Sequence, residues 1–211
     1  MESLFYNLLQ KPLKSFDPLK PEDTFTPIAN DLMKNYHIKC GNIKLFLAEI
    51  EFYYSRVKDK KCLETVHNKW EGVTYTRKTN AGDFFYHLSG CDICFESNLE
   101  NSIGEEGGIL IRSIVDESGK ITAGPISCVN MMLNSCGKGY TPALCKNDEK
   151  RDVEVVPTFR FLGEKDFNSI KEGNNKDRDL RLAFFDNKLN KNDWDNARPS
   201  YYSSRLIKYN K

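Results

Sequence analysis

The pattern of apolar and polar positions along the chain predicts several strands and a few short helices. A helix is expected from Pro27 to about Tyr36, because proline suits a first helical turn. Ile28, Leu32 and Met33 then share one face of that helix, which would bury it against a sheet. A turn is expected next, at Gly41-Asn42.

Alternating or continuous apolar runs predict the strands. Residues 55–82 and 134–151 lie between such runs, are rich in polar, charged or glycine residues, and are expected to be loops. A short helix is expected over 127–133, after Gly124-Pro125. The expected strands are 44–54, 84–95, 108–115, 153–162, 180–186 and 201–209.

These elements predict the α+β class, as one domain on a mixed, curved, antiparallel-rich sheet with a few short helices. The length of 211 residues is compatible with a single domain. Residues 1–24 contain three prolines and are expected to form an N-terminal arm, so the domain would span residues 25–211.

The segment 44–54 is the most informative strand. One of its faces is apolar throughout, whereas the other changes from leucine to acid: Leu45, Leu47, Glu49 and Glu51. Two carboxylates at this spacing lie roughly 7 Å apart. They indicate either the wet side of an edge strand or the wall of a cleft, where an acid beside aromatic rings can act as a general base.

Arg112 interrupts the apolar run GILIRSIV. A buried guanidinium is costly without an anionic partner. The candidates are a bound phosphate or one of the acids Glu51, Glu49 and Asp92. We predict that Arg112 contacts Glu51 on a neighbouring strand, directly or through a water.

Composition narrows the function classes. Lys+Arg 31 against Asp+Glu 30 gives a net charge of +1, which disfavours a strongly basic nucleic-acid binder but allows a local basic groove. No apolar run approaches the ~20 residues of a membrane span, and the first residues lack a secretory signal pattern. A cytoplasmic location is expected, with the seven cysteines as free thiols and disulfides as the alternative.

Two histidines and a CxxC pair raise the question of a metal. Cys91 and Cys94 have the spacing of zinc ligands, and His67 and His87 would be needed to complete four. The pair lies in an expected strand and no second CxxC exists, so no metal site is predicted. The histidines are then hydrogen-bonded structural groups or parts of a site.

Basic and aromatic residues alternate in two stretches, 55–80 and 198–209. Basic groups that follow a phosphate backbone, with aromatic rings on which bases stack, are typical of a nucleic-acid surface. A solvated, charged loop explains the same composition.

Six short motifs occur in order over roughly residues 25–130. They are Ala29-Asn-Asp31-Leu32-Met33, Glu49-Ile-Glu51-Phe-Tyr53, Glu64-Thr-Val-His67, Tyr86-His-Leu-Ser89-Gly90, Ile109-Leu-Ile-Arg112-Ser and Gly124-Pro125. In order and spacing they resemble the alkyladenine (3-methyladenine) DNA glycosylase family. Little beyond residue 135 can be aligned with that family.

The resemblance implies a monofunctional DNA N-glycosylase of base excision repair. Such enzymes flip a damaged, alkylated or deaminated purine out of duplex DNA and hydrolyse its N-glycosidic bond without metal or cofactor. Glu51 would activate the water, and Arg112 would position the glutamate and water or a neighbouring phosphate. Tyr53, His67 and Tyr86 would line the base pocket.

The implied partner is duplex DNA, with no membrane and no obligate protein partner. The protein would act as a monomer, associated with the nucleoid if it is bacterial. The expected DNA-binding residues are Ser89, Arg56, Lys69, Arg77 and Lys78.

Several positions depart from the family pattern. Ser89 replaces a tyrosine that wedges into the duplex, and an aromatic wedge offsets part of the unstacking cost. Glu96 stands where the pocket has an asparagine, and Asp92 adds a carboxylate. The alternative is therefore a protein that keeps the fold without catalysis, or that binds another nucleotide or a protein partner.

Overall fold

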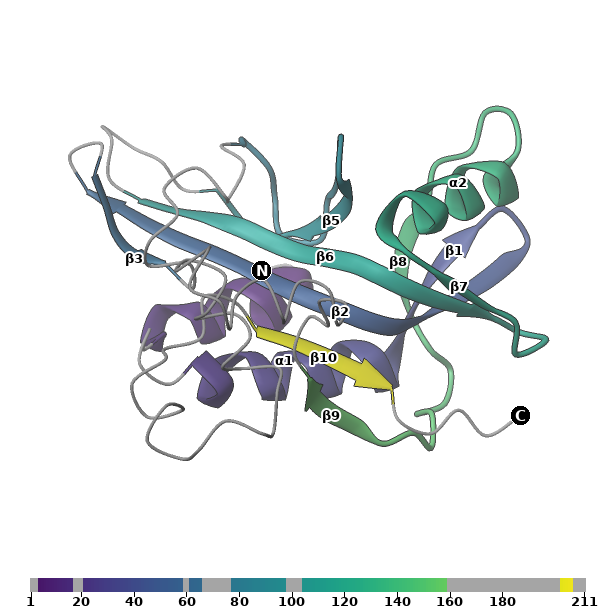
Figure 1. The fold of residues 1–211 in the computed structure, drawn as a ribbon, viewed down its shortest axis with the longest axis horizontal. Coiled ribbons are helices and arrows are strands. Elements are labelled where there is room, and N and C mark those ends of the chain that lie inside the picture. The colour runs from purple at the N-terminus through teal and green to yellow at the C-terminus, as the bar shows by residue number, and fades with distance from the viewer. Residues whose placement is uncertain are drawn as a thin grey trace, which may run out of the picture.

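The computed structural model describes residues 4–16, 21–58, 61–65, 77–97, 104–158 and 202–206. Within them the fold is α+β, with a curled antiparallel sheet that forms half a barrel (Figure 1). The helices are α1 (Pro21–Asn35) and α2 (Pro125–Cys136), preceded by two short turns at Tyr6–Gln10 and Lys11–Ser15. The strands are β1 (Tyr36–Cys40), β2 (Ile43–Lys58), β3 (Lys61–Thr65), β4 (Phe84–His87), β5 (Gly90–Cys94), β6 (Gly104–Asp116), β7 (Ile121–Ala123), β8 (Ala143–Lys146), β9 (Val155–Thr158) and β10 (Tyr202–Leu206).

The long strands β2 and β6 are the spine of the sheet. The main order of strands is β4-β5-β6-β2-β1-β8, and every described pairing within it is antiparallel. Because β2 is long and bent, its second edge is shared by β1, β10 and β3 in turn. The α+β class is confirmed, whereas the specific glycosylase fold remains a prediction.

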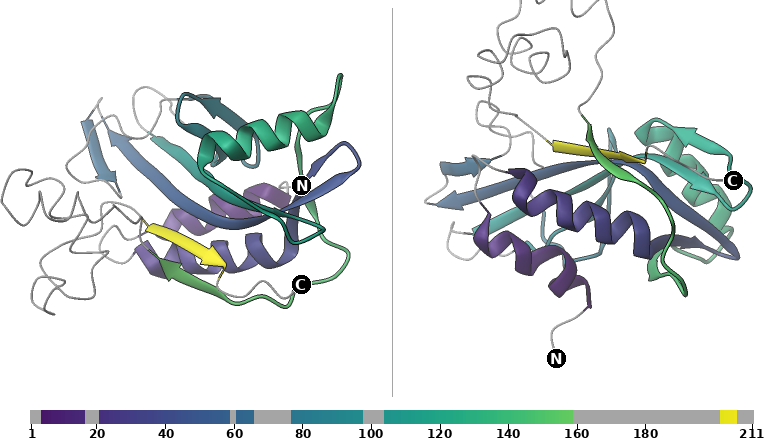
Figure 2. Two further views of the ribbon diagram at one scale, coloured as in Figure 1. Left: turned by 45° about the vertical axis from the view of Figure 1, so that its right-hand side comes forward. Right: turned by 90° about the horizontal axis from the view of Figure 1, so that it is seen from below.

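Helix α1 and the N-terminal turns pack together on one side of the sheet (Figure 2). The ring of Phe25 stacks on Phe52 of β2 at 4.5 Å, and Phe16 meets Tyr54 edge-on at 4.7 Å. The expected start at Pro27 was wrong, since α1 begins at Pro21. The buried Phe25 ring holds the first turns of the helix against the sheet, which outweighs the cost of Pro27 within the helix.

A paired irregularity interrupts the ladder between β2 and β6. Each strand inserts one residue there, Ala48 in β2 and Arg112 in β6. The register before and after the insertions is the same. The pairs across this region are Leu47 with Ile114, Glu49 with Ser113, and Ile50 with Ile111.

This double bulge changes which residues of β2 face the core. Leu45 and Leu47 before it and Ile50, Phe52 and Tyr54 after it belong to one core cluster. The buried positions thus change from odd to even numbers across the bulge. The predicted single face of two leucines and two acids was therefore wrong, because simple alternation does not survive a bulge.

Other boundaries also differ from expectation. The expected strand 84–95 is a hairpin of β4 and β5, because the chain turns at Leu88-Ser89. Strand β2 extends to Lys58 and β3 follows, within a segment expected to be a loop. The expected loop 134–151 contains the end of α2 and strand β8. The expected strand at 180–186 lies outside the described residues.

The first residues of the chain contribute to the core. Leu9 and Leu13 have no exposed area, and Leu8 is also buried. The described part of the expected N-terminal arm therefore packs against the domain. Six cysteines of the described region are free thiols, as expected, and burial raises the pKa of the Cys128 thiol to about 12. None of the described helices is long and apolar enough to cross a membrane.

We predict that Phe25→Ala lowers the free energy of unfolding by about 3–5 kcal/mol, because it removes a buried ring stacked on the sheet. Ile126→Ala on the exposed side of α2 is the control and should change it by less than about 0.5 kcal/mol. Urea unfolding followed by circular dichroism measures both. Equal effects would contradict the docking of α1 through Phe25.

Candidate active site

Glu51 lies at the centre of a polar cluster on the sheet face away from the core, which we call the site face. Its carboxylate has no exposed area. Arg112 Nη1 donates to Glu51 Oε2 at 2.8 Å, and the Tyr53 hydroxyl donates to Glu51 Oε1 at 2.5 Å. Each carboxylate oxygen thus accepts a hydrogen bond from a different side chain. The predicted contact between Arg112 and Glu51 is confirmed.

Glu49 forms the second half of the cluster. Arg112 Nε lies 3.6 Å from Glu49 Oε1, and the Ser113 hydroxyl donates to Glu49 Oε2 at 3.3 Å. Unlike Glu51, Glu49 keeps 15% of its side-chain area exposed. One guanidinium therefore holds two carboxylates, of which only the outer one reaches solvent.

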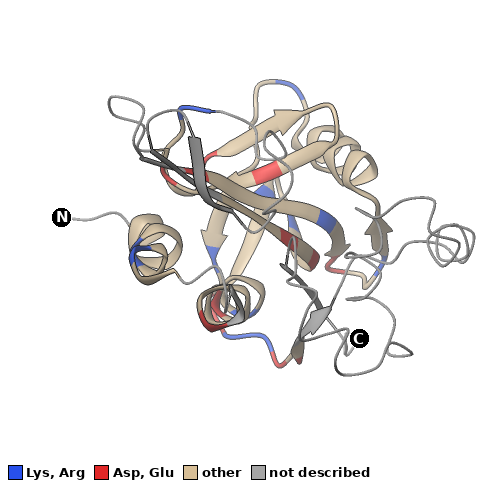
Figure 3. Ribbon diagram, turned by 60° about the vertical axis from the view of Figure 1, so that its left-hand side comes forward, with Lys and Arg blue, Asp and Glu red and all other residues tan. Residues whose placement is uncertain are grey.

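The double bulge explains why Arg112 can sit inside an apolar strand. Ile111 and Ile114 on either side of it face the core. The inserted residue lets Arg112 leave the core alternation and point at the acids of β2. The sheet thereby pairs one cation with two acids and leaves none of the three charges alone. Figure 3 marks the acidic and basic positions along the strands in red and blue.

The electrostatics keep this guanidinium charged. Burial lowers the pKa of Arg112, but the charges of Glu51 and Glu49 outweigh that effect and raise the pKa above its ordinary value. Arg112 is accordingly a permanent cation beside Glu51. Its planar guanidinium carries several N–H donors, so it can contact the carboxylates of Glu49 and Glu51 at the same time.

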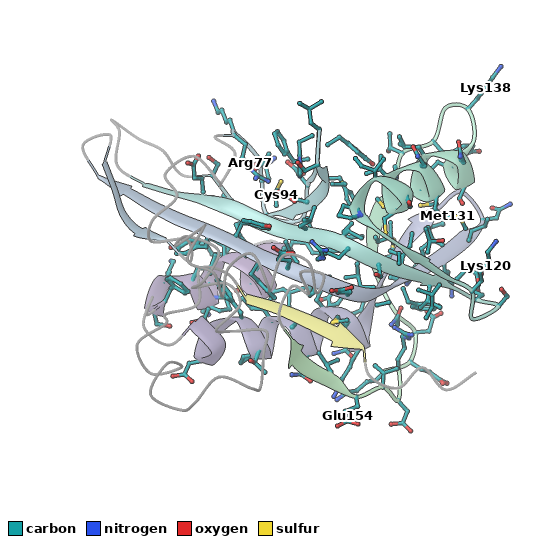
Figure 4. All side chains as sticks on the ribbon, in the orientation of Figure 1. Arg77, Cys94, Lys120, Met131, Lys138 and Glu154 are labelled. Atoms are coloured by element: carbon teal, nitrogen blue, oxygen red, sulfur yellow. The ribbon has the colours of Figure 1, made fainter. Side chains whose placement is uncertain are left out.

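A second polar network lies on the same face, on the hairpin of β4 and β5. Arg77 Nη1 donates to Asp92 Oδ2 at 2.7 Å, and His87 Nε2 lies 3.1 Å from Asp92 Oδ1. The Arg77 guanidinium also lies over the Phe85 ring, 4.4 Å from its centre. Arg77 and Cys94 mark this network in Figure 4. The side chains of Arg77, Asp92 and His87 are each at most 7% exposed.

The two networks are neighbours. Asp92 pairs with Leu110 of β6, and Leu110 pairs with Glu51 of β2. Paired residues lie on one face of a sheet, so Asp92 and Glu51 are two strand spacings apart, about 10 Å. The Asp92 carboxylate, which departs from the family pattern, is therefore paired with Arg77.

Tyr86 does not belong to this site. It pairs with Cys91, whereas Phe85 pairs with Asp92. Alternation therefore places Tyr86 on the opposite face from Glu51. This placement does not favour the expected role of Tyr86 in the base pocket, which stays a prediction, and Phe85 and His87 occupy the site face instead. The alternation of residues 84–87 indicates that Phe85 and His87 share a face, but it does not say which face Glu51 lies on.

The expected DNA-binding residues differ in their exposure to solvent. Arg77 is a buried partner of Asp92, which does not favour its expected contact with DNA, and that contact stays a prediction. Lys78 and Ser89 are exposed and keep that prediction. His67 and Lys69 lie outside the described residues, as does the side chain of Arg56.

A zinc site would need at least a third ligand beside Cys91 and Cys94. Three residues apart on a strand, the two thiols leave from opposite faces, and Cys94 lies with Arg77 at 3.7 Å. In the described part of the chain, no three His, Cys, Asp or Glu side chains form a group that could hold a metal ion. The acid cluster around Glu51 is thus the main candidate for chemistry.

Comparison of the chain with protein-family models, with curated proteins and with solved structures gives no match. The glycosylase resemblance therefore depends on the six sequence motifs alone.

We predict that Arg112→Leu destabilises the protein by about 3–5 kcal/mol, because it leaves the fully buried Glu51 charge without its cation. Arg112→Lys should cost less, since it keeps a charge while losing the fork geometry. Denaturant unfolding of both variants at neutral pH measures the difference. A Leu variant as stable as the Lys variant would show that the pair contributes little.

Proposed function

We propose that the protein hydrolyses the N-glycosidic bond of a damaged purine flipped out of duplex DNA, with Glu51 activating the water. The observation that carries the proposal is the Glu51 carboxylate, which is fully buried and bound by Arg112 and Tyr53. The family resemblance assigns the water-activating role to this same residue. Base excision repair is the function that best accounts for both the buried site and the family resemblance.

The proposed chemistry needs a fixed anion beside the sugar. The water oxygen bonds to C1′ as the bond to the base breaks, and the base leaves with the bonding electrons. Positive charge that develops on the sugar is stabilised by the carboxylate, which also takes the proton of the water. Each Glu51 oxygen has a second lone pair beyond its bond to Arg112 or Tyr53. Because Glu51 has no exposed area, the water must enter the site together with the flipped nucleotide.

The turn between β4 and β5 supplies a candidate contact with the duplex. Leu88 at this turn is 96% exposed, next to Ser89. Apolar side chains, leucine among them, insert between base steps in several classes of DNA-binding protein. In this proposal Leu88 takes the wedge position that Ser89 cannot fill. The Asp92 side of the same hairpin lies on the site face with Glu51.

The remaining features of the proposal follow from the same resemblance. The protein acts as a monomer, without metal or cofactor, on duplex DNA in the cytoplasm or nucleoid. Its single domain includes the N-terminal turns as well, because Leu9 and Leu13 are buried in the core and α1 begins at Pro21. Because Glu96 and Glu49 are acidic, the proposal names no particular damaged base. Direct assay of base release identifies it.

A second candidate is a protein that keeps this fold but binds another nucleotide or a protein partner. The observation in its favour is that Arg77 is internally paired and Tyr86 faces away from Glu51. Neither position favours the expected base-pocket role of Tyr86 or the expected DNA contact of Arg77. Binding to duplex DNA and its salt dependence separate the two candidates.

We predict that the purified protein releases methylated or deaminated purines from duplex DNA and that Glu51→Gln abolishes this release. The amide keeps the shape but cannot take a proton. Glu154→Gln is the matched control, because Glu154 is an exposed glutamate that precedes β9 and does not lie on β2 or β6 (Figure 4). Release of free base is followed by chromatography. Undiminished release by the Glu51→Gln variant, or none from any lesion tested, rejects the proposal.

We further predict that Leu88→Ser weakens binding to duplex DNA by about tenfold while leaving the melting temperature unchanged, since Leu88 is almost fully exposed. Leu133→Ser on α2, another exposed leucine, should leave the affinity unchanged. Fluorescence anisotropy over a range of salt concentrations measures both. A salt slope near zero for the unmodified protein would favour the second candidate.

A further inference from the structure

His87 uses both ring nitrogens, and its contacts define its tautomer. The backbone N–H of Ser89 donates to His87 Nδ1 at 3.1 Å, and an N–H can only donate. Nδ1 must therefore be without a proton in this arrangement. Nε2 then carries the proton and donates to Asp92 Oδ1 at 3.1 Å. The imidazole is neutral and joins the hairpin turn to a buried carboxylate.

Asp92 is itself held from the other side. Its second oxygen accepts from Arg77 Nη1 at 2.7 Å, and both side chains are at most 3% exposed. Arg77, Asp92 and His87 thus form a chain of contacts, and the Phe85 ring packs against both of its ends. The centre of the Phe85 ring lies 4.4 Å from the Arg77 guanidinium and 5.8 Å from the centre of the His87 ring. Gly108 makes room for the pair of Arg77 and Asp92, because a Cβ at this position would lie 3.0 Å from Arg77 Nη1 and from Asp92 Cβ.

The end of this chain of contacts is the turn that presents Leu88. The turn is short, from His87 to Gly90, and Gly90 adopts a φ of +145° that favours glycine. A Cβ at Gly90 would lie 2.6 Å from Pro125 Cβ at the start of α2. The turn is thus held by the His87 ring on one side and lies close against α2 on the other.

We propose that Arg77, Asp92 and His87 form a positioning relay that holds the Leu88-Ser89 turn in the shape that contacts duplex DNA. None of the three touches the reacting atoms. Their role is to fix the turn relative to Glu51, about 10 Å from Asp92 on the same face. The contact with DNA rests on the proposed function, whereas the relay itself is a property of the folded chain.

The first test needs no DNA. Nitrogen-15 NMR of the unmodified protein at neutral pH should show His87 with a protonated Nε2 and an unprotonated Nδ1. The Ser89 amide should be protected from hydrogen exchange although Ser89 is exposed. An Nδ1–H tautomer, or an unprotected Ser89 amide, overturns the relay.

Two substitutions divide the contacts of His87. In His87→Gln the terminal amide reaches toward Asp92 but offers no acceptor at the place of Nδ1. In His87→Asn the side-chain oxygen takes that place and accepts from Ser89, but it is too short to reach Asp92. Ser89 amide exchange should become about tenfold faster in the Gln variant, and the Asn variant should keep most of the protection.

Binding completes the test, with a duplex that carries an abasic-site analogue as the probe. The Gln variant should bind this probe about fivefold more weakly, the equivalent of one neutral hydrogen bond. Its rate of base release from a duplex that carries the damaged purine, at saturating enzyme, should stay within about twofold of the unmodified protein. The Asn variant should bind more tightly than the Gln variant. Equal weakening by both variants overturns the relay.

The two proposals fail in different ways. If Glu51→Gln leaves base release intact, the proposed function fails and the Ser89 exchange result still stands. If Glu51→Gln abolishes release but His87→Gln changes neither Ser89 exchange nor duplex affinity, only the relay fails.

Discussion

The ion pair between Glu51 and Arg112 is the interaction on which the site depends. A carboxylate with no exposed area has lost its hydration, at a cost of several kcal/mol. Arg112 and Tyr53 replace that hydration with hydrogen bonds of 2.8 and 2.5 Å. Because the cation comes from β6 and the acid from β2, the charge pairing and the strand pairing require each other. A change in register would leave both charges buried and unpaired.

The double bulge makes this arrangement compatible with a packed core. A regular ladder would keep Leu45 and Leu47 on the same face as Glu49 and Glu51, which would mix leucines with acids. By inserting one residue in each strand, β2 and β6 turn the leucines into the core and Arg112 out of it. The net register is unchanged, so the long ladder continues on both sides. The polar cluster therefore costs the sheet only a local irregularity.

The site face carries its charges in internally compensated groups. Arg112 serves two carboxylates, and Arg77 serves Asp92. Neither guanidinium is available as a simple phosphate contact, which agrees with a chain whose net charge is only +1. In the proposed function, contact with DNA falls to exposed positions such as the turn that carries Leu88. Recognition would then depend on shape and on a preformed turn more than on a basic surface.

Local patterns determined the α+β class, the strand that carries Glu51 and the need of Arg112 for an acid, because alternation and the cost of a buried charge act within or between short segments. They could not determine the bulge at Ala48, since its stability comes from residues of two strands about 60 positions apart. The turn at Leu88 was equally hidden, and with it the face on which Tyr86 lies. Only tertiary packing decided these points, because register is set by what each face buries across the whole sheet.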